Sequence, residues 1–347
     1  MRTCVAAVAV SLLLCTGASA RDPALTAETI NAAEWAAPAK AKKLNPSVLK
    51  AQVMLDRAGF SPGVIDAHGG ENFEKALRAF QGKNGLEATG KLDQATWTKL
   101  AEGASGPAVT EYTVAARDLK GPFVKKIPKD YEKMGKLDRL GYRGPREALA
   151  EKFHMSEDLL TALNPGKDFR HADSTIVVAN VGADATPARE GRTRKDANTG
   201  STREPAGKAA KAARVEVNKS ERSVRVFGED DSLVAYFPAS IGSSEKPAPS
   251  GKFEVRAVAE NPTYRYNPEF GFKGQKAKEP VEIAPGPNNP VGAVWIALSA
   301  ETYGIHGTPE PDQVSKTASH GCIRLTNWDA LALAKLVKKG TPVEFVE

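Results

Sequence analysis

The sequence has few cysteines and no apolar run long enough to cross a membrane. Three of its 347 residues are cysteine, and Cys4 and Cys15 lie within the first fifteen. Cys322 is the only cysteine in the rest of the chain, so that remainder cannot be stapled by an internal disulfide. The apolar stretch from Val5 to Leu14 is too short for a spanning helix.

Residues 1–20 have the organisation of a signal peptide. A short positive start, Met1-Arg2, precedes the apolar stretch, and Ala18-Ser19-Ala20 forms a small-residue cleavage site. We expect cleavage after this site and export to a periplasm or cell wall. The alternative is a lipoprotein anchored at Cys15, although Leu14 stands where a small residue would be expected.

Nucleic-acid-binding motifs are also absent. The formal net charge is +6, and a basic protein can bind nucleic acid, an anionic membrane surface or an anionic polymer. The sequence has no helix-turn-helix pattern, no zinc-finger spacing and no aromatic RNA-binding motif, which argues against a nucleic-acid partner. For an exported chain, the positive charge fits an anionic cell wall.

The first part of the mature chain predicts a leader and a helical domain. Residues 21–45 are rich in Ala and Lys and predict a flexible leader, with one short helix around Trp35. Residues 46–103 predict three short helices, because apolar residues recur at helical spacing and Asp93 is suited to cap the third helix. Phe80-Gln81 and the Gly-rich turns resemble the peptidoglycan-binding domain of cell-wall enzymes. The alternative is a helical spacer.

Residues 111–181 predict a small α/β module. The order is a strand at Tyr112, two helices, and a returning strand at residues 175–179, with Leu163-Asn164-Pro165-Gly166 ending the second helix. This order resembles a degenerate LysM glycan-binding module that has a long insertion after Tyr112. A structural connector fits the same pattern.

The remaining chain divides into a linker and a domain rich in strands. Residues 182–212 contain almost no large apolar side chains, which predicts a basic, disordered linker. In residues 213–347 the apolar period becomes two, with a single helix expected from Trp328 to Val337. The long segment between Asn261 and Asn289 has no clear period, and loops of that length are usually functional.

Cys322 lies in a pattern typical of thiol catalysis. An unpaired thiol in an oxidising compartment needs a reason, and catalysis is the best one available. His306 and His320 lie close in sequence, and an imidazole within hydrogen-bond reach can remove the thiol proton. Two alternatives use the same residues: a buried inert cysteine, or a zinc site with both histidines, for which no fourth ligand is evident.

The residues around this thiol carry a family resemblance. His306-Gly307 and Ser319-His320-Gly321-Cys322-Ile323-Arg324-Leu325, followed by Asn327, resemble the signature of YkuD-type (ErfK/YbiS-like) L,D-transpeptidases. The likeness extends over roughly residues 213–347. It implies a YkuD-like β-sandwich with one late helix and no cofactor or metal. The whole chain is then multidomain, with a mostly-β catalytic domain preceded by a three-helix domain and an α/β module.

The resemblance also implies a role for each residue of the signature. Cys322 would be the nucleophile and His306 its base, with no disulfide or metal involved. The remaining roles are shaping of the oxyanion pocket by His320, Gly321, Ser319 and Gly307, and substrate binding by Arg324, Tyr264, Tyr266 and Asn327. Ser319 is expected to contribute a turn hydrogen bond, and Asn327 to stabilise the start of the following helix.

The implied function is exported peptidoglycan L,D-transpeptidation through a Cys322 thioester. The partners would be stem peptides and glycan, with a wall-attached protein as a further acceptor. If water instead of an amine attacked the same thioester, the protein would be a carboxypeptidase or amidase of the cell wall. A non-catalytic peptidoglycan-binding protein is the alternative from another class.

Overall fold

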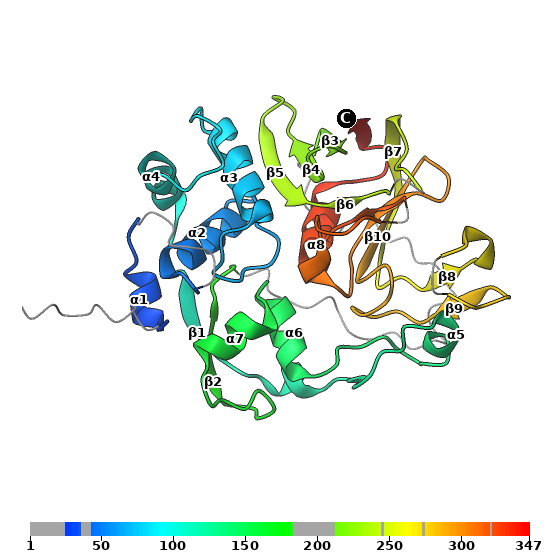
Figure 1. The fold of residues 1–347 in the computed structure, drawn as a ribbon, viewed down its shortest axis with the longest axis horizontal. Helices are drawn as coiled ribbons and strands as arrows, with labels where there is room; N and C mark the ends of the chain where they lie inside the picture. Colours follow the sequence, from blue (N-terminus) through cyan, green and yellow to red (C-terminus); the bar gives the residue numbers. More distant parts are fainter. Residues whose placement is uncertain (1–24, 36–42, 183–211, 244–245, 273–274, 320) are drawn as a thin grey trace, which may run out of the picture.

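A computed structural model describes residues 25–35, 43–182, 212–243, 246–272, 275–319 and 321–347. The expected signal peptide, Cys15, most of the linker at 182–212 and His320 lie outside these residues. Figure 1 shows the described part as helices and a two-stranded unit on one side and a large sheet on the other. Within it, no helix combines the length and apolarity needed to cross a bilayer.

The start of the described chain is packed, which differs from the flexible leader expected for residues 21–45. Helix α1 (Ala27–Asn31) begins at the N-cap Thr26 and ends before Trp35, around which the helix was predicted. Ile30 is fully buried, and Asn31 exchanges hydrogen bonds with the backbone of Val109. The buried Ile30 of this short helix therefore packs in the same core as Val109, Leu149 and Ile176 of the α/β module.

The helical domain contains three helices: α2 (Pro46–Arg57), α3 (Glu71–Lys83) and α4 (Gln94–Gly103). Asp93 caps α4 as predicted, because its side chain accepts a hydrogen bond from the Thr96 N–H at 2.8 Å. The unusual loop before α3 binds the second module, with the Ile65 N–H donating to His154 and the Ser156 N–H donating to Ile65.

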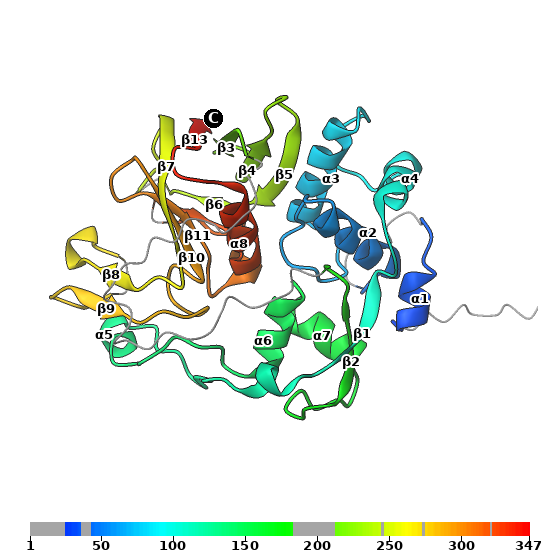
Figure 2. The same ribbon diagram turned by 180° about the vertical axis from the view of Figure 1, so that it is seen from behind.

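The second module has the predicted order of strand, helix, helix and strand. Strand β1 (Val109–Thr113) pairs antiparallel with β2 (Thr175–Ala179), and α6 (Pro145–Lys152) and α7 (Glu157–Leu163) lie between them in sequence. The insertion after β1 runs away from this unit along the large sheet, where it forms α5 (Tyr131–Met134). Figures 1 and 2 both place α5 beside β8 and β9.

The catalytic half contains a nine-stranded mixed sheet, in the order β5-β4-β3-β13-β7-β10-β11-β12-β6. The two end strands of this order, β5 and β6, are separated in sequence only by Ala239, so the sheet folds back on itself. The ten-residue β7 belongs to both halves of this wrapped sheet. The strands are β3 (Arg214–Asn218), β4 (Ser223–Phe227), β5 (Leu233–Pro238), β6 (Ser240–Ile241), β7 (Gly251–Glu260), β10 (Val294–Leu298), β11 (Gly304–His306), β12 (Ile323–Arg324) and β13 (Pro342–Val346).

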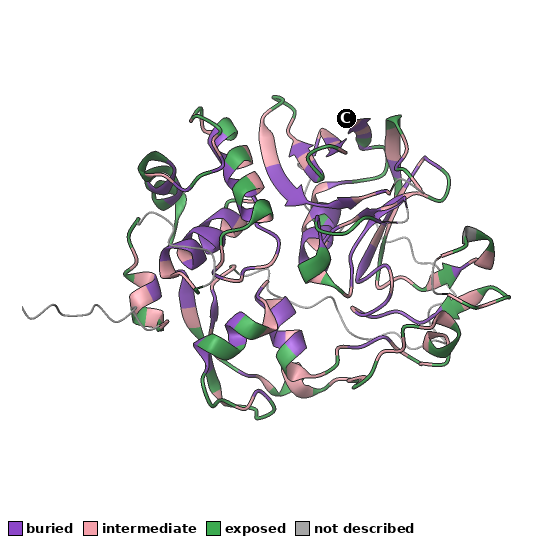
Figure 3. Ribbon diagram, in the orientation of Figure 1, coloured by how far each residue is buried: buried purple, intermediate pink, exposed green. Residues whose placement is uncertain are grey.

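One late helix, α8 (Asn327–Leu336), packs against this sheet, and the mostly-β prediction is confirmed. Leu333 and Ala330 of α8 are fully buried, and buried residues line the inner sides of the strands in Figure 3. Strands β8 (Tyr264–Tyr266) and β9 (Val281–Ile283) form a separate antiparallel pair within the long segment that lacked a period.

Candidate active site

Adjacent parallel strands place the predicted base opposite Arg324, which follows the predicted nucleophile by two residues. In the pairing of β11 with β12, Ile305 is opposite Ile323 and His306 is opposite Arg324. Both isoleucines are buried in the core. Because side chains alternate along a strand, His306 and Arg324 face away from the two isoleucines, and Cys322 immediately precedes β12. His306 and Cys322, which are sixteen positions apart in sequence, thus lie in neighbouring segments of the fold.

His306 is held as a neutral imidazole with one nitrogen free. Its Nδ1 lies 2.7 Å from the Gly307 carbonyl oxygen, which can only accept, so Nδ1 carries the proton and Nε2 is available as a base. The side chain is 6% exposed, and its ring stacks on Trp295 with centroids 5.5 Å apart. Burial and the nearby Arg324 guanidinium lower the pKa of His306 to about 3.

Cys322 is a half-buried, reduced thiol. Its Sγ lies 3.8 Å from the carbonyl oxygen of Thr302, to which the S–H donates weakly. Burial raises the pKa of the thiol above its ordinary value, although the Gly304 N–H and the charges of Arg324 and Lys246 act in the opposite direction. At neutral pH the resting residues are therefore a thiol and an uncharged imidazole.

The turn before Cys322 requires a glycine. Gly321 has φ +102°, a conformation that side-chain-bearing residues rarely adopt, and a Cβ there would lie 3.1 Å from the Tyr303 ring. Ser319 is buried and its hydroxyl donates to the carbonyl oxygen of Cys322, in keeping with the hydrogen-bonding role expected for it. His320 lies outside the described residues.

Arg324 brings a positive charge to the thiol side of the sheet. Among the residues that the structure describes, no carboxylate forms an ion pair with its guanidinium, although Glu310 lies close enough to raise its pKa against the lowering effect of burial. A partly buried guanidinium without an ion-pair partner is suited to receive a carboxylate from outside the protein.

The two tyrosines predicted to bind substrate differ in position. Tyr264 is half-buried, and the charge of Cys322 contributes to the raised pKa of its hydroxyl, mainly a result of burial, so it lies near the thiol. Tyr266 is only 2% exposed and packs within the protein, so it does not offer a free binding face. Between them lies Tyr131 of α5, with ring centroids 6.0 Å from Tyr264 and 5.0 Å from Tyr266.

Asn327 has a buried side chain and does not cap the helix that it begins. Thr326 is the N-cap, since its hydroxyl accepts from the Asp329 N–H. Asn327 is 3% exposed, and its Oδ1 accepts from the N–H groups of Ala293 and Thr308. The cap at the helix start thus comes from Thr326, the Asn327 amide bonds to backbone groups and to Glu151, and substrate binding by Asn327 stays a prediction.

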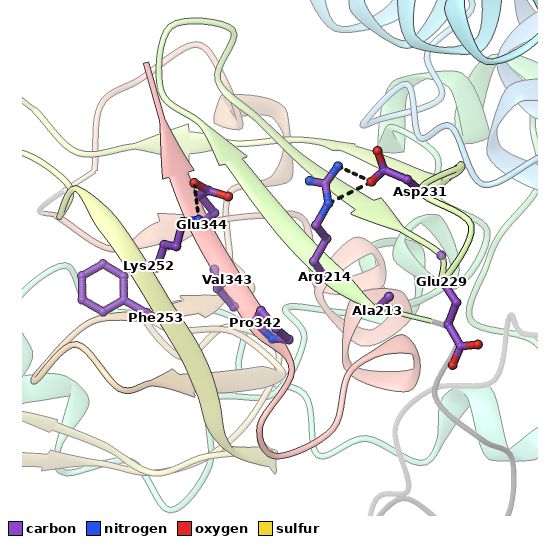
Figure 4. Close-up of a pocket in the computed structure, with 10 residues that line it drawn as sticks. Ala213, Arg214, Glu229, Asp231, Lys252, Phe253, Pro342, Val343 and Glu344 are labelled. Carbon is purple, nitrogen blue, oxygen red and sulfur yellow. Dashed lines mark hydrogen bonds and ion pairs between the residues drawn. The ribbon is translucent and has the colours of Figure 1, made fainter.

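Other parts of the surface fit the chemistry less well. A pocket of about 360 Å³ lies along β3, β13 and β7, two or more strands from β12, and four of its charged side chains bond to one another in pairs (Figure 4). Arg214 binds Asp231 there at 2.6 Å, and Lys252 binds Glu344 at 3.5 Å. No group of three or more metal-ligating side chains gathers in the described part of the chain.

Sequence reasoning missed residues that are far from the signature. Tyr131 is contributed by the insertion in the second module, and Glu151 of α6 is a hydrogen-bond partner of Asn327. Trp295 stacks on the imidazole from the neighbouring strand. Only Trp295 lies within residues 213–347, over which the family likeness extends, and so carried a signal that could have identified it.

An imidazole at the end of β11 and a thiol directly before the neighbouring β12 are the arrangement expected of a cysteine-dependent catalytic domain. Residues 212–345 match the sequence model of the YkuD L,D-transpeptidase catalytic domain, and residues 45–100 match that of a peptidoglycan-binding domain. The chain belongs to the YkuD family of L,D-transpeptidases, as its signature predicted.

Two relatives illustrate the extent of this similarity. YkuD of Bacillus licheniformis, named as an L,D-transpeptidase, is 34% identical over 130 residues, covering 38% of this chain and 63% of that protein. YqjB of Bacillus subtilis, named likewise, is 34% identical over 132 residues, covering 37% of this chain and 67% of that protein. The chain thus spans less than two thirds of the first relative.

The solved structure of L,D-transpeptidase 3 from Mycobacterium tuberculosis is 19% identical where it aligns. The alignment covers 38% of this chain and 59% of that chain, with a TM-score of 0.32. A TM-score of this size does not establish a shared overall arrangement.

Proposed function

We propose that this protein is an exported peptidoglycan L,D-transpeptidase. The observation that carries the proposal is the pairing of His306 with Arg324 in β11 and β12, with Cys322 directly before β12 and the imidazole Nε2 free to accept a proton. The family to which the chain belongs supports the same reaction.

The proposed reaction has two acyl-transfer steps. Cys322 Sγ attacks the carbonyl of an L-to-D peptide bond in a donor stem peptide, and its proton passes to His306 Nε2. The C–N bond breaks, the D-amino acid leaves with that proton, and a thioester remains on Cys322. An acceptor amine then attacks the thioester, an amide forms, and the thiol is regenerated. No ATP is consumed, because the thioester retains the energy of the cleaved peptide bond.

The surrounding residues have proposed roles in this reaction. The backbone around His320 and Gly321 would hold the oxyanion, where one donor is typically worth about 3 kcal/mol of barrier. Arg324 would bind a donor carboxylate, which is supported by its lack of an ion-pair partner among the described residues. Tyr264 would contact the donor beside the thiol. The helical domain would bind wall polymer, and glycan binding by residues 111–181 stays a prediction.

The acceptor distinguishes this function from its rivals. Transfer to a second stem peptide makes a crosslink, and transfer to a protein amine attaches that protein to the wall. Transfer to water makes the protein a carboxypeptidase or amidase. Export, to a periplasm or an outer wall, is supported by the signal-peptide pattern of residues 1–20.

Incubation of the purified protein with tetrapeptide-bearing disaccharides, followed by mass spectrometry, tests the proposal. A crosslinked dimer is expected. Tripeptide alone would indicate hydrolysis, and unchanged substrate would indicate a non-catalytic binder. The Cys322→Ala protein should lose turnover while it still sediments with wall sacculi, and turnover retained by that variant would refute the nucleophile assignment.

A further inference from the structure

The histidine tautomer depends on a single peptide group. The Gly307 carbonyl oxygen accepts a hydrogen bond from the protonated Nδ1 of His306 at 2.7 Å. This carbonyl lies in the same peptide plane as the N–H of Thr308. That N–H donates to Asn327 Oδ1 at 3.1 Å. The imidazole and Asn327 thus hold the two ends of one rigid peptide group, so a rotation of that group would move the carbonyl that orients the base.

Asn327 is fixed tightly against this peptide. A Cβ added to Gly307 would lie 2.2 Å from Asn327 Oδ1, so the close approach requires glycine at that position. Oδ1 also accepts from the Ala293 N–H at 2.9 Å, and Nδ2 donates to the Pro287 carbonyl at 3.1 Å. These bonds set the orientation of the amide, with Nδ2 facing away from His306.

The last partner of Asn327 comes from a different module. Glu151, in helix α6 of the second module, accepts from Asn327 Nδ2 with Oε2 at 3.0 Å and Oε1 at 3.3 Å. Glu151 is 8% exposed, and Tyr142 of the same module donates to its Oε2 at 3.5 Å. Helices α6 and α8 lie against each other, which brings Glu151 to this position (Figure 1).

We infer that Glu151 is a positioning residue for the proposed transpeptidation, acting on His306 through Asn327 and the peptide group between Gly307 and Thr308. The inference rests on the proposed function. The second module then serves catalysis directly as well as linking the helical domain to the sheet. Burial raises the pKa of Glu151 to about 8, so a neutral side chain of the same shape is a suitable replacement at pH 7.

The test compares Glu151→Ala, Glu151→Gln and wild type in the full-length protein. We expect Glu151→Ala to lower kcat about tenfold with little change in the donor KM, because a hydrogen bond that orients the base is lost while the donor-binding residues remain. Glu151→Gln keeps an acceptor for Asn327 and should restore kcat to within about twofold of wild type. The rate at which iodoacetamide alkylates Cys322 at pH 7 should follow the same order.

Ser61→Ala is the matched control. Ser61 of the helical domain also bonds to α8 across a module boundary, donating to Asp329 Oδ2 at 3.0 Å, but it has no link to Gly307. Its kcat and alkylation rate should match wild type even if its melting temperature falls. A kcat for Glu151→Ala equal to that of wild type, or an equal loss in Ser61→Ala, would overturn the inference. If the wild type shows no turnover, the proposed function fails, and the alkylation rates still decide whether Glu151 positions His306.

Discussion

Arg324 carries a positive charge that no described carboxylate of the protein pairs with. It is partly buried on the thiol side of β12, and among the described residues it has no ion-pair partner. We predict that Arg324→Gln raises the KM for a donor with a free carboxylate at least tenfold, since hydrogen bonds to charged groups are worth about 1.5–3 kcal/mol. Steady-state kinetics with a defined stem peptide measures this change.

An amidated donor separates this charge effect from general damage. With the carboxylate blocked, wild type and Arg324→Gln should differ by less than about threefold in KM, because the guanidinium then has no anion to bind. Arg265→Gln, on the exposed side of the neighbouring β8, is the matched control and should leave both donors unaffected. An equal penalty for the two donors would show that Arg324 supports the fold instead.

At the scale of single residues, sequence reasoning depended on local patterns. The signature placed His306, Gly307, Ser319 and Cys322 in one short stretch, and their hydrogen bonds follow from that closeness. It could not assign Asn327, because the partners of its amide are 34 and 176 positions away. A side chain whose role is set by distant backbone carries no local signal.

At the scale of elements, the β8–β9 pair and α5 form one unit beside the thiol. Tyr131 packs edge-on against both tyrosines of β8, and its backbone N–H donates to Gln275 Oε1 at 2.9 Å. The Leu140 N–H donates to Pro285, and Leu140 is fully buried against Ile283. The insertion of the second module thus holds the segment that carries Tyr264.

We predict that Tyr131→Ala raises the donor KM several-fold and leaves kcat within about twofold. Each edge-on aromatic contact is worth about 0.5–1.5 kcal/mol, and their loss would release Tyr264 without touching His306 or Cys322. Alkylation of Cys322 by a bulky maleimide should become faster, because the segment beside the thiol is held less firmly. Kinetics and intact-protein mass measure the two effects.

Leu137→Ala is the control for this prediction. Leu137 packs in the same apolar cluster but makes no aromatic contact with Tyr264. Its melting temperature should fall while its KM stays near wild type. A raised kcat in Tyr131→Ala would instead identify the insertion as an inhibitory cover, and an unchanged KM would remove Tyr131 from the donor site.

Elements were predicted well where periodicity alone determines them. The period of two in residues 213–255 corresponds to β3, β4, β5 and β7, and the late helix lies one residue from its predicted limits. The parallel pairing of β11 with β12 and the return of β6 beside β12 could not be predicted, because pairing is set by the whole sheet. The strands β8 and β9, in the segment between Asn261 and Asn289, were not predicted either, because three residues are too few to show a period and their pairing depends on the fold.

At the scale of the whole molecule, all three folded parts meet around the first turn of α8. Asp329 accepts from Ser61 of the helical domain. Beside it, Trp328 stacks on His154 of the second module with ring centroids 5.2 Å apart, and His154 Nδ1 lies 2.9 Å from Asp56. The residues that follow the catalytic signature are therefore also the junction of the modules.

This junction should make the folded protein less stable as pH rises from 6 to 9. Burial raises the pKa of Asp329 to about 7 and that of Glu151 to about 8, well above their unfolded values near 4. Between these values the folded chain binds more protons than the unfolded chain, so stability decreases with pH by up to about 1.4 kcal/mol per unit for each group. The raised pKa of His154 acts in the same direction, because its charged form is lost as pH rises.

Melting temperatures of wild type and Asp329→Asn, measured by calorimetry at pH 6 and pH 9, test this coupling. Wild type should melt about 5 °C or more lower at pH 9. Asn is neutral at both pH values and still accepts from Ser61, so the variant should lose clearly less on going to pH 9. Asp138→Asn is the matched control, since Asp138 is an exposed carboxyl on the insertion after β1, outside the junction. If Asp329→Asn and wild type lose the same amount, the titration of Asp329 does not contribute to the pH dependence of stability.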